Sequence, residues 1–124
     1  MKPSGLEMQI LSVLWERGPS TAREVLENMP DGKERAYTSI LSVMQQMDKK
    51  GLLKRSREGV TDRWRPAKAK KSVMGQYLGD LVQKICGGKP ANAVLHLLEN
   101  TKVNESELEE IEKVIKDYRE RTGK

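Results

Sequence analysis

Short, neutral, hydrogen-bonding side chains lie along one side of a helix that the sequence predicts from about Glu34 to Lys50. The helix is predicted because apolar residues recur there at spacings of three and four, which places them on one face. Those apolar residues are Tyr37, Ile40, Leu41, Met44 and Met47. A helix with a purely solvated outer face would usually carry Lys and Glu on that face. The outer face here instead carries Thr38, Ser39, Ser42, Gln45 and Gln46.

Side chains of this kind suit a helix that lies in the major groove of DNA. The groove brings the helix backbone close to the base edges, so the donors and acceptors must be short. Thr38, Ser39 and Ser42 meet that requirement and are the candidate base contacts. The Thr38 methyl group can also contact a thymine methyl, while Gln45 or Gln46 can bond to an adenine or to a phosphate oxygen.

Cations flank this helix along the chain. Residues 31 to 71 include twelve Lys and Arg against five Asp and Glu, a balance of +7, whereas residues 99 to 124 include six against eight, a balance of −2. A basic half of this kind favours a polyanionic partner, although a charge run is more often a solvated face. We expect the edges of the neutral face to contact the DNA backbone. The candidate backbone or edge contacts are Thr21, Arg35, Tyr37, Gln45, Gln46, Lys50, Lys54, Arg55, Arg57, Arg63 and Arg65.

Residues suited to catalysis or metal binding are few. His96 is the only histidine, and it stands among leucines with no Cys, Asp or Glu at ligand spacing. Cys86 is the only cysteine, so it cannot form an internal disulfide, which agrees with a reducing compartment. We therefore expect no enzyme activity, no bound metal and no cofactor.

Two further helices are predicted before the neutral helix. Residues 6 to 17 have a helical apolar period that Gly18 and Pro19 end. Thr21 and Glu24 then have the spacing of a capping box, which starts a second helix. The amides at that start are a candidate phosphate site. The helix with the neutral face is therefore the third, and it ends at Gly51, where a left-handed backbone is possible without a Cβ.

A basic hairpin is predicted at residues 52 to 66. Trp64 is expected to pack on the helices while its neighbours Arg63 and Arg65 point the opposite way, because side chains alternate along a strand. Pro66 ends the second strand. Three short helices followed by a two-stranded ribbon is the order of a winged helix-turn-helix domain. We predict a mostly α fold with a small β-hairpin wing, in which residues 1–70 form a DNA-binding domain.

Residues 71–124 are predicted to form a three-helix dimerisation region. Its apolar stripes begin at Val73, but roughly 50 residues hold too little apolar volume for a stable core. A second copy of the chain would cover the stripes, because twofold pairing is the commonest oligomer. The alternative is that these helices fold back on the winged domain. The expected dimer residues are Leu78, Leu81, Val82, Ile85, Leu95, Leu98, Leu108, Ile111, Ile115 and Tyr118.

The last helix of this region has two candidate caps. Asn104 with Glu107, or Ser106 with Glu109, can form a capping box at its start.

The sequence also bears on where the protein works. It has no apolar run near the roughly 20 residues that span a bilayer. Residues 1 to 5 read MKPSG and lack the hydrophobic segment of a secretion signal. We expect a cytoplasmic protein that does not bind membranes directly.

Three stretches resemble the penicillinase and methicillin-resistance repressor family (BlaI/MecI type), which has the copper-responsive CopY repressors as relatives. They read ILSVLWERGPSTAREVLENM, RAYTSILSVMQQMDKKGLLKR and REGVTDRWRP. The resemblance implies a homodimeric winged-helix repressor that binds an inverted-repeat operator in double-stranded DNA. It also implies base contacts by Thr38, Ser39 and Ser42, and a dimer formed by the C-terminal helices.

The resemblance further implies a possible release mechanism. In antibiotic-responsive members, a membrane-bound sensor protease triggers cleavage of the repressor at an Asn-Phe pair in the dimerisation segment. The corresponding position here reads His96-Leu97, and the chain ends ERTGK without the paired cysteines of the CopY repressors. Gln46 and Val60 stand where Arg is common in the family, and each change removes an expected phosphate contact.

Two other function classes fit the sequence. One is a protein-binding adaptor with a winged-helix shape, in which Thr38 and its neighbours contact another protein. The other is a regulator that senses a small molecule in a pocket between the C-terminal helices. Absent or salt-insensitive DNA binding would favour the adaptor, and DNA affinity that shifts with a small molecule would favour the sensor.

Overall fold

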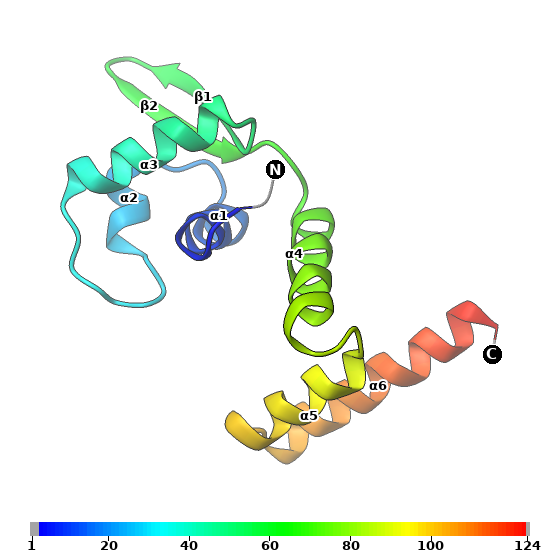
Figure 1. Ribbon diagram of the computed structural model, residues 1–124. Helices are drawn as coiled ribbons and strands as arrows, with labels where there is room; N and C mark the ends of the chain where they lie inside the picture. Colours follow the sequence, from blue (N-terminus) through cyan, green and yellow to red (C-terminus); the bar gives the residue numbers. More distant parts are fainter. Residues whose placement is uncertain (1–2, 124) are drawn as a thin grey trace. The chain divides into compact units, whose positions relative to one another are not determined.

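The computed structural model describes residues 3–123 as two compact units, one that ends at Asp80 and one that begins at Leu81 (Figure 1). The elements of the chain are α1 (Gly5–Arg17), α2 (Ala22–Glu27), α3 (Tyr37–Lys49), β1 (Leu53–Glu58), β2 (Thr61–Pro66), α4 (Lys70–Ile85), α5 (Pro90–Asn100) and α6 (Glu105–Thr122).

Capping boxes begin both helices that precede the neutral helix. At α1, the Ser4 hydroxyl accepts from the Glu7 amide and the Glu7 carboxylate accepts from the Ser4 amide. At α2, Thr21 and Glu24 exchange the same pair of bonds, at 3.1 and 2.8 Å. The capping box expected for Thr21 is confirmed. Each box satisfies two amides that the first turn of a helix leaves without partners.

The neutral helix is shorter at its start than the sequence indicated. It begins at Tyr37 rather than near Glu34, and Ala36 precedes it with extended dihedral angles and no side-chain cap. Before it, the Arg35 guanidinium makes two hydrogen bonds to the Asp31 carboxylate, at 2.9 and 2.6 Å. That pair links the two ends of the segment from Asp31 to Arg35. At the other end Gly51 has the expected left-handed backbone, with φ of 81°.

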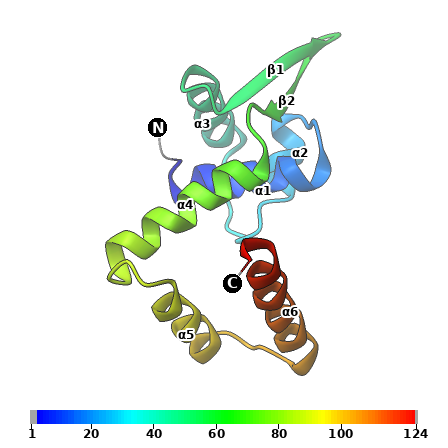
Figure 2. The ribbon, with the colours of Figure 1, turned by 90° about the vertical axis from the view of Figure 1, so that its right-hand side faces the viewer.

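The hairpin pairs β1 with β2 in antiparallel register, with Arg55 opposite Trp64 and Arg57 opposite Asp62. Trp64 is 1% exposed and Arg65 beside it is exposed, so the predicted alternation is confirmed there, whereas Arg63 on the other side is half-buried. The second strand begins at Thr61 and ends at Pro66, the predicted end. Figure 2 shows the hairpin turn projecting away from α1 and α3 of the first unit.

The first unit has one hydrophobic core. Its innermost residues are Ile10, Leu11, Leu14, Val25, Ile40, Met44, Met47, Leu53 and Trp64, from α1, α2, α3 and both strands. Three helices and a two-stranded hairpin around one core form the winged helix-turn-helix fold that the sequence predicted.

The start of α4 belongs to the same unit as the winged core. Val73 is buried in that core, and Met74 and Tyr77 pack against it. The Trp15 indole N–H also donates to the carbonyl of Lys68, at 3.2 Å. The compact unit therefore extends to Asp80, past the domain boundary that the sequence suggested at residue 70.

The second unit holds the end of α4 together with α5 and α6. Pro90 occupies the first turn of α5, where its missing amide costs nothing. Asn104 caps α6 by accepting from the Glu107 amide at 2.8 Å, which selects the first of the two expected caps. Among the described residues, no helix is long and apolar enough to cross a membrane.

Candidate nucleic-acid interface

Helix α3 presents the neutral face to solvent and buries the opposite face. Ile40, Met44 and Met47 are fully buried, which fixes the rotation of the helix on the core. The five neutral residues Thr38, Ser39, Ser42, Gln45 and Gln46 are all exposed. Within the described residues, 3–123, their side chains have no hydrogen-bond partner, so their donors and acceptors are available to a ligand.

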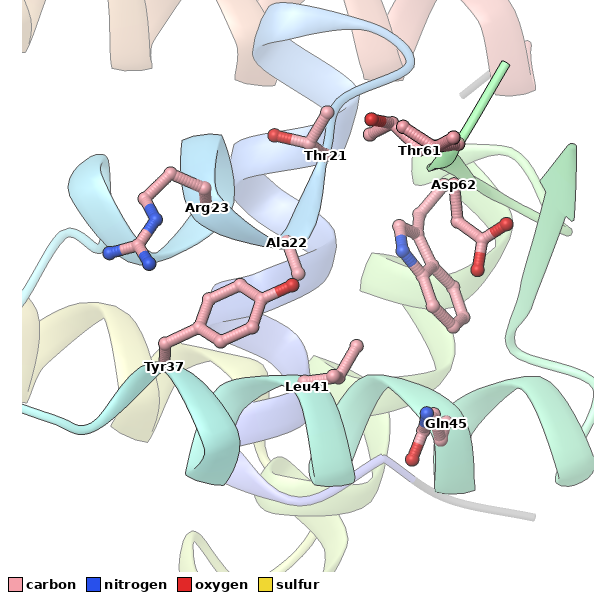
Figure 3. Close-up of a pocket in the computed structure, with 10 residues that line it drawn as sticks. Thr21, Ala22, Arg23, Tyr37, Leu41, Gln45, Thr61 and Asp62 are labelled. Carbon is pink, nitrogen blue, oxygen red and sulfur yellow. The ribbon is translucent and has the colours of Figure 1, made fainter. Parts of the chain in front are cut away.

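A concave surface lies between the start of α2, the neutral helix and the hairpin, and it encloses a volume of about 450 Å³ (Figure 3). Tyr37, Leu41 and Gln45 line it from α3, and Thr61 and Asp62 line it from the hairpin. Tyr37 and Leu41 are half-buried, so they lie at the margin of the core.

Arg23 lies at the α2 side of the same concave surface. Its guanidinium carbon is 4.6 Å from the centroid of the Tyr37 ring. Arg23 was not among the predicted contacts, because this cation–π contact joins two helices and depends on the fold. The ring holds the Arg23 charge beside the start of the neutral helix, where a polyanion could approach.

Most of the expected cations are already paired with carboxylates. Arg55 lies 3.5 Å from Asp48 and 3.6 Å from Asp62. Arg57 lies 3.2 Å from the same Asp62. These pairs reduce the positive charge that the hairpin presents beside α3.

Arg63 pairs with two carboxylates, one on the neighbouring strand and one on α2. It lies 3.0 Å from Glu58 on β1 and 3.5 Å from Glu24 on α2. By contrast, Lys54 and Arg65 form no ion pair within the described part of the chain. These two exposed cations stand opposite each other in the strand register.

An ion pair with a buried carboxylate holds Lys50. Its ammonium group lies 2.8 Å from Glu7, whose side chain is only 6% exposed. Burial raises the pKa of the Glu7 carboxyl, but hydrogen bonds from Lys50 and Ser4 outweigh burial, so the pKa lies below its ordinary value. The pair joins the start of α1 to the end of α3, and this gives Lys50 a structural role that its position in the sequence did not reveal.

The start of α2 already holds a negative charge. The Thr21 hydroxyl is used as the helix cap, and the Glu24 carboxylate accepts from the Thr21 amide. That backbone hydrogen bond is the main reason that the pKa of Glu24 lies below its ordinary value. A phosphate at the Thr21 amide would have to compete with this carboxylate.

The two positions at which the family resemblance implied Arg are both open to solvent. Val60 is 90% exposed at the hairpin turn, next to Gly59 with φ of 63°. Gln46 is exposed on α3. An Arg side chain at either position would therefore be accessible to a ligand.

The expected dimer residues lie mostly at the surface of the described chain. Ile85 is 73% exposed, Tyr118 57% and Leu78 50%, while Val82, Leu108 and Ile111 are half-buried. The other expected dimer residues, also exposed, are Leu81, Leu95, Leu98 and Ile115. Apolar side chains at this exposure favour a partner that covers them.

The remaining candidate positions carry no chemistry of their own. His96 and Leu97 are exposed within α5, and Cys86 is half-buried directly after α4. Among the described residues, no group of three or more His, Cys, Asp or Glu side chains could hold a metal ion.

The chain matches known proteins over most of its length. The sequence model of a family described as penicillinase repressor matches residues 3–117. The chain is 28% identical over 104 residues to a protein named transcriptional regulator BlaI in two strains of Mycobacterium tuberculosis, and the match covers 82% of this chain and 75% of that protein.

A solved structure also has a similar fold. A MarR family protein from Bacillus stearothermophilus matches with a TM-score of 0.52 and 18% identity, over 100% of this chain and 78% of that chain. At this identity the match bears on the fold alone.

Proposed function

Because the chain belongs to the penicillinase repressor family, we propose that it represses transcription by binding an inverted-repeat operator in DNA as a homodimer. One observation carries the proposal. The solvent face of α3 is exposed and neutral, and its short side chains have no partners within the described residues. A face of that kind can approach base edges in the major groove, where long charged side chains would keep the helix away.

In the proposed complex, the neutral helix reads bases and its surroundings hold the backbone. Thr38, Ser39 and Ser42 contact base edges, and Gln45 and Gln46 bond to bases or phosphates at the edges of the face. The hairpin cations then neutralise phosphates on one side of the helix. Lys54 and Arg65 support this role best, because neither is paired within the described residues.

The second unit is proposed to form the dimer. Its exposed apolar side chains would be covered by the same residues of a second copy, as twofold symmetry requires. Such a dimer would place two recognition helices about one DNA turn, roughly 34 Å, apart on one side of the duplex. The link between them raises affinity, because binding of the first half-site holds the second close to its own.

Release of the repressor is proposed to occur through the second unit. Cleavage of α5 between His96 and Leu97 would separate α6 from the DNA-binding unit and remove part of the dimer surface. Both residues are exposed, which supports access by a protease, although a helix must open locally before a protease can cleave it. Incubation with membranes from the native host, under conditions that relieve repression, should give fragments that end at His96. Fragments cut elsewhere would count against this position.

The function can be tested without knowing the operator. The full chain would be used to select duplexes from a random-sequence library, and binding would be measured at two salt concentrations. We expect an enriched inverted repeat whose affinity falls steeply with salt, because the phosphate contacts release counterions. No enrichment, or binding that does not change with salt, would contradict the proposal and favour a protein-binding adaptor.

A further inference from the structure

Asp62 holds two arginines of the hairpin at once. Its carboxylate lies 3.2 Å from Arg57 and 3.6 Å from Arg55. Asp62 and Arg57 are directly opposite in the strand register, and Arg55 is two residues away on the same face. Both arginines remain open to water, with side chains 65% and 44% exposed. A single carboxylate therefore partly neutralises two cations that DNA would otherwise meet.

The position of Asp62 places this carboxylate at the candidate interface. Asp62 lines the concave surface together with Tyr37 and Gln45 of α3, as Figure 3 shows, and its side chain is 27% exposed. A phosphate that approached Arg57 from this surface would meet a negative charge beside it. Two like charges at contact distance repel each other appreciably when their surroundings are only partly solvated.

Arg55 does not need Asp62 to stay in place. Its guanidinium carbon lies 5.2 Å from the centroid of the Trp64 ring, and its Nε atom lies 3.5 Å from Asp48 on α3. Trp64 is fully buried and cannot move away. The carboxylate of Asp62 thus adds negative charge to an arginine that two other groups already position. This favours an electrostatic role for Asp62 over a positioning role.

We propose, on the basis of the DNA-binding function above, that Asp62 is an affinity-lowering residue that competes with DNA phosphates for Arg55 and Arg57. Asp62 affects the contacts between the protein and the DNA backbone, and it does not distinguish one DNA sequence from another. Every duplex must draw the two arginines away from the same carboxylate, so operator and unrelated DNA lose affinity by the same factor. The base contacts of α3 then determine which DNA sequence the protein prefers, while its affinity for every sequence is lower.

The test is the substitution Asp62→Asn, which removes the charge and keeps the shape of the side chain. We expect tighter binding, by roughly threefold to tenfold, to both the selected operator and a scrambled duplex. The slope of log affinity against log salt should steepen by about one, because about one more phosphate is neutralised. The ratio of the two affinities should not change.

The matched control is Asp117→Asn in the second unit. Asp117 pairs with Lys113 at 3.2 Å, the same separation as Asp62 and Arg57, and its loss changes the net charge equally. Equal effects of the two substitutions would mean that only total charge matters, which overturns the proposal. Weaker binding by Asp62→Asn, or a changed ratio of affinities, would also overturn it. Thermal unfolding and the mass of the particle in solution would be checked for both variants.

A second variant identifies the cations that respond. In the Arg57→Gln background, Asp62→Asn should give a smaller gain in affinity, because one of the two competing sites is gone. An undiminished gain would exclude Arg57 from the mechanism and overturn the proposal as stated. The outcome is separable from the proposed function, because salt-sensitive operator binding by the unaltered chain is measured first. If that binding is absent, the function fails, and if it is present, only the role of Asp62 is at stake.

Discussion

Replacement of Lys50 by Met should destabilise the first unit, although Lys50 lies at the edge of the proposed DNA surface. The change leaves the Glu7 carboxylate buried, with its side chain 6% exposed and only the Ser4 amide as a remaining partner. Removal of one member of a buried ion pair typically costs about 3–5 kcal/mol. Lys50 itself is 33% exposed, so water already screens the pair, and we expect a lower cost of about 2 kcal/mol.

The measurement is unfolding in urea, followed by tryptophan fluorescence. Both tryptophans, Trp15 and Trp64, belong to the first unit, so the signal reports that unit and not the second. The control is Lys49→Met, which removes the same charge from an exposed neighbour. With a denaturant dependence of about 1–3 kcal/mol per M, a loss of about 2 kcal/mol lowers the urea midpoint by roughly 0.7–2 M. Equal shifts for the two variants would refute a stabilising role for the ion pair.

The stability that Lys50 supplies should also depend on pH, and the pKa of Glu7 sets the direction of that dependence. The pKa of Glu7 is lower in the folded chain than its ordinary value of 4.5, so the unfolded chain binds more protons between the two values. The stability that the pair supplies is therefore fully present above pH 4.5 and is lost as pH falls through the folded pKa. The difference in unfolding free energy between the unaltered chain and Lys50→Met should shrink in acid. A difference that stayed constant from neutral pH to pH 3 would contradict this account.

Four further substitutions test the fold, the base contacts, the phosphate contacts and the dimer. Trp64→Ala should cost about 3–5 kcal/mol of unfolding free energy, measured in urea by circular dichroism, because it empties the centre of the core. Thr38→Ala should change the preference among operator variants by roughly 1–3 kcal/mol, while Arg57→Ala should weaken operator and scrambled duplexes alike in fluorescence anisotropy. Ile115→Lys should give a monomer in sedimentation analysis and weaker operator binding, and an unchanged dimer would exclude α6 from the interface.

Much of the fold could be predicted because the signals are local. The helices of the first unit follow from apolar spacings and capping boxes within a few residues, and the hairpin follows from alternation around Trp64. The predicted start of α3 near Glu34 was wrong, because the apolar spacing begins only at Tyr37 and Arg35 before it is held by Asp31. A pattern of residue types cannot distinguish a charged side chain at the start of a helix from one that closes a turn.

Only part of the candidate site could be predicted from the sequence. The neutral face of α3 is a property of one helix, and its exposure could be anticipated. The pairing of Lys50, and one of the two pairs of Arg63, could not be anticipated, because the partner carboxylates lie far away along the chain. Lys50 and Glu7 are separated by 43 positions, and Arg63 and Glu24 by 39. Side chains with the same charge in the sequence therefore have different roles: Lys50 is held in a buried pair, whereas Lys54 is unpaired among the described residues.

These pairs have a consequence for how a repressor of this design would bind. If carboxylates already neutralise part of the charge around Arg35, Arg55, Arg57 and Arg63, one unit gains less from phosphates than its count of cations suggests. A single half-site would then be weak, and occupancy would depend on the link between two units. Loss of the dimer would release the DNA without any change to the recognition helix. The exposed apolar surface of the second unit, rather than the charged surface of the first, is therefore the place where a signal would act most strongly on the proposed repressor.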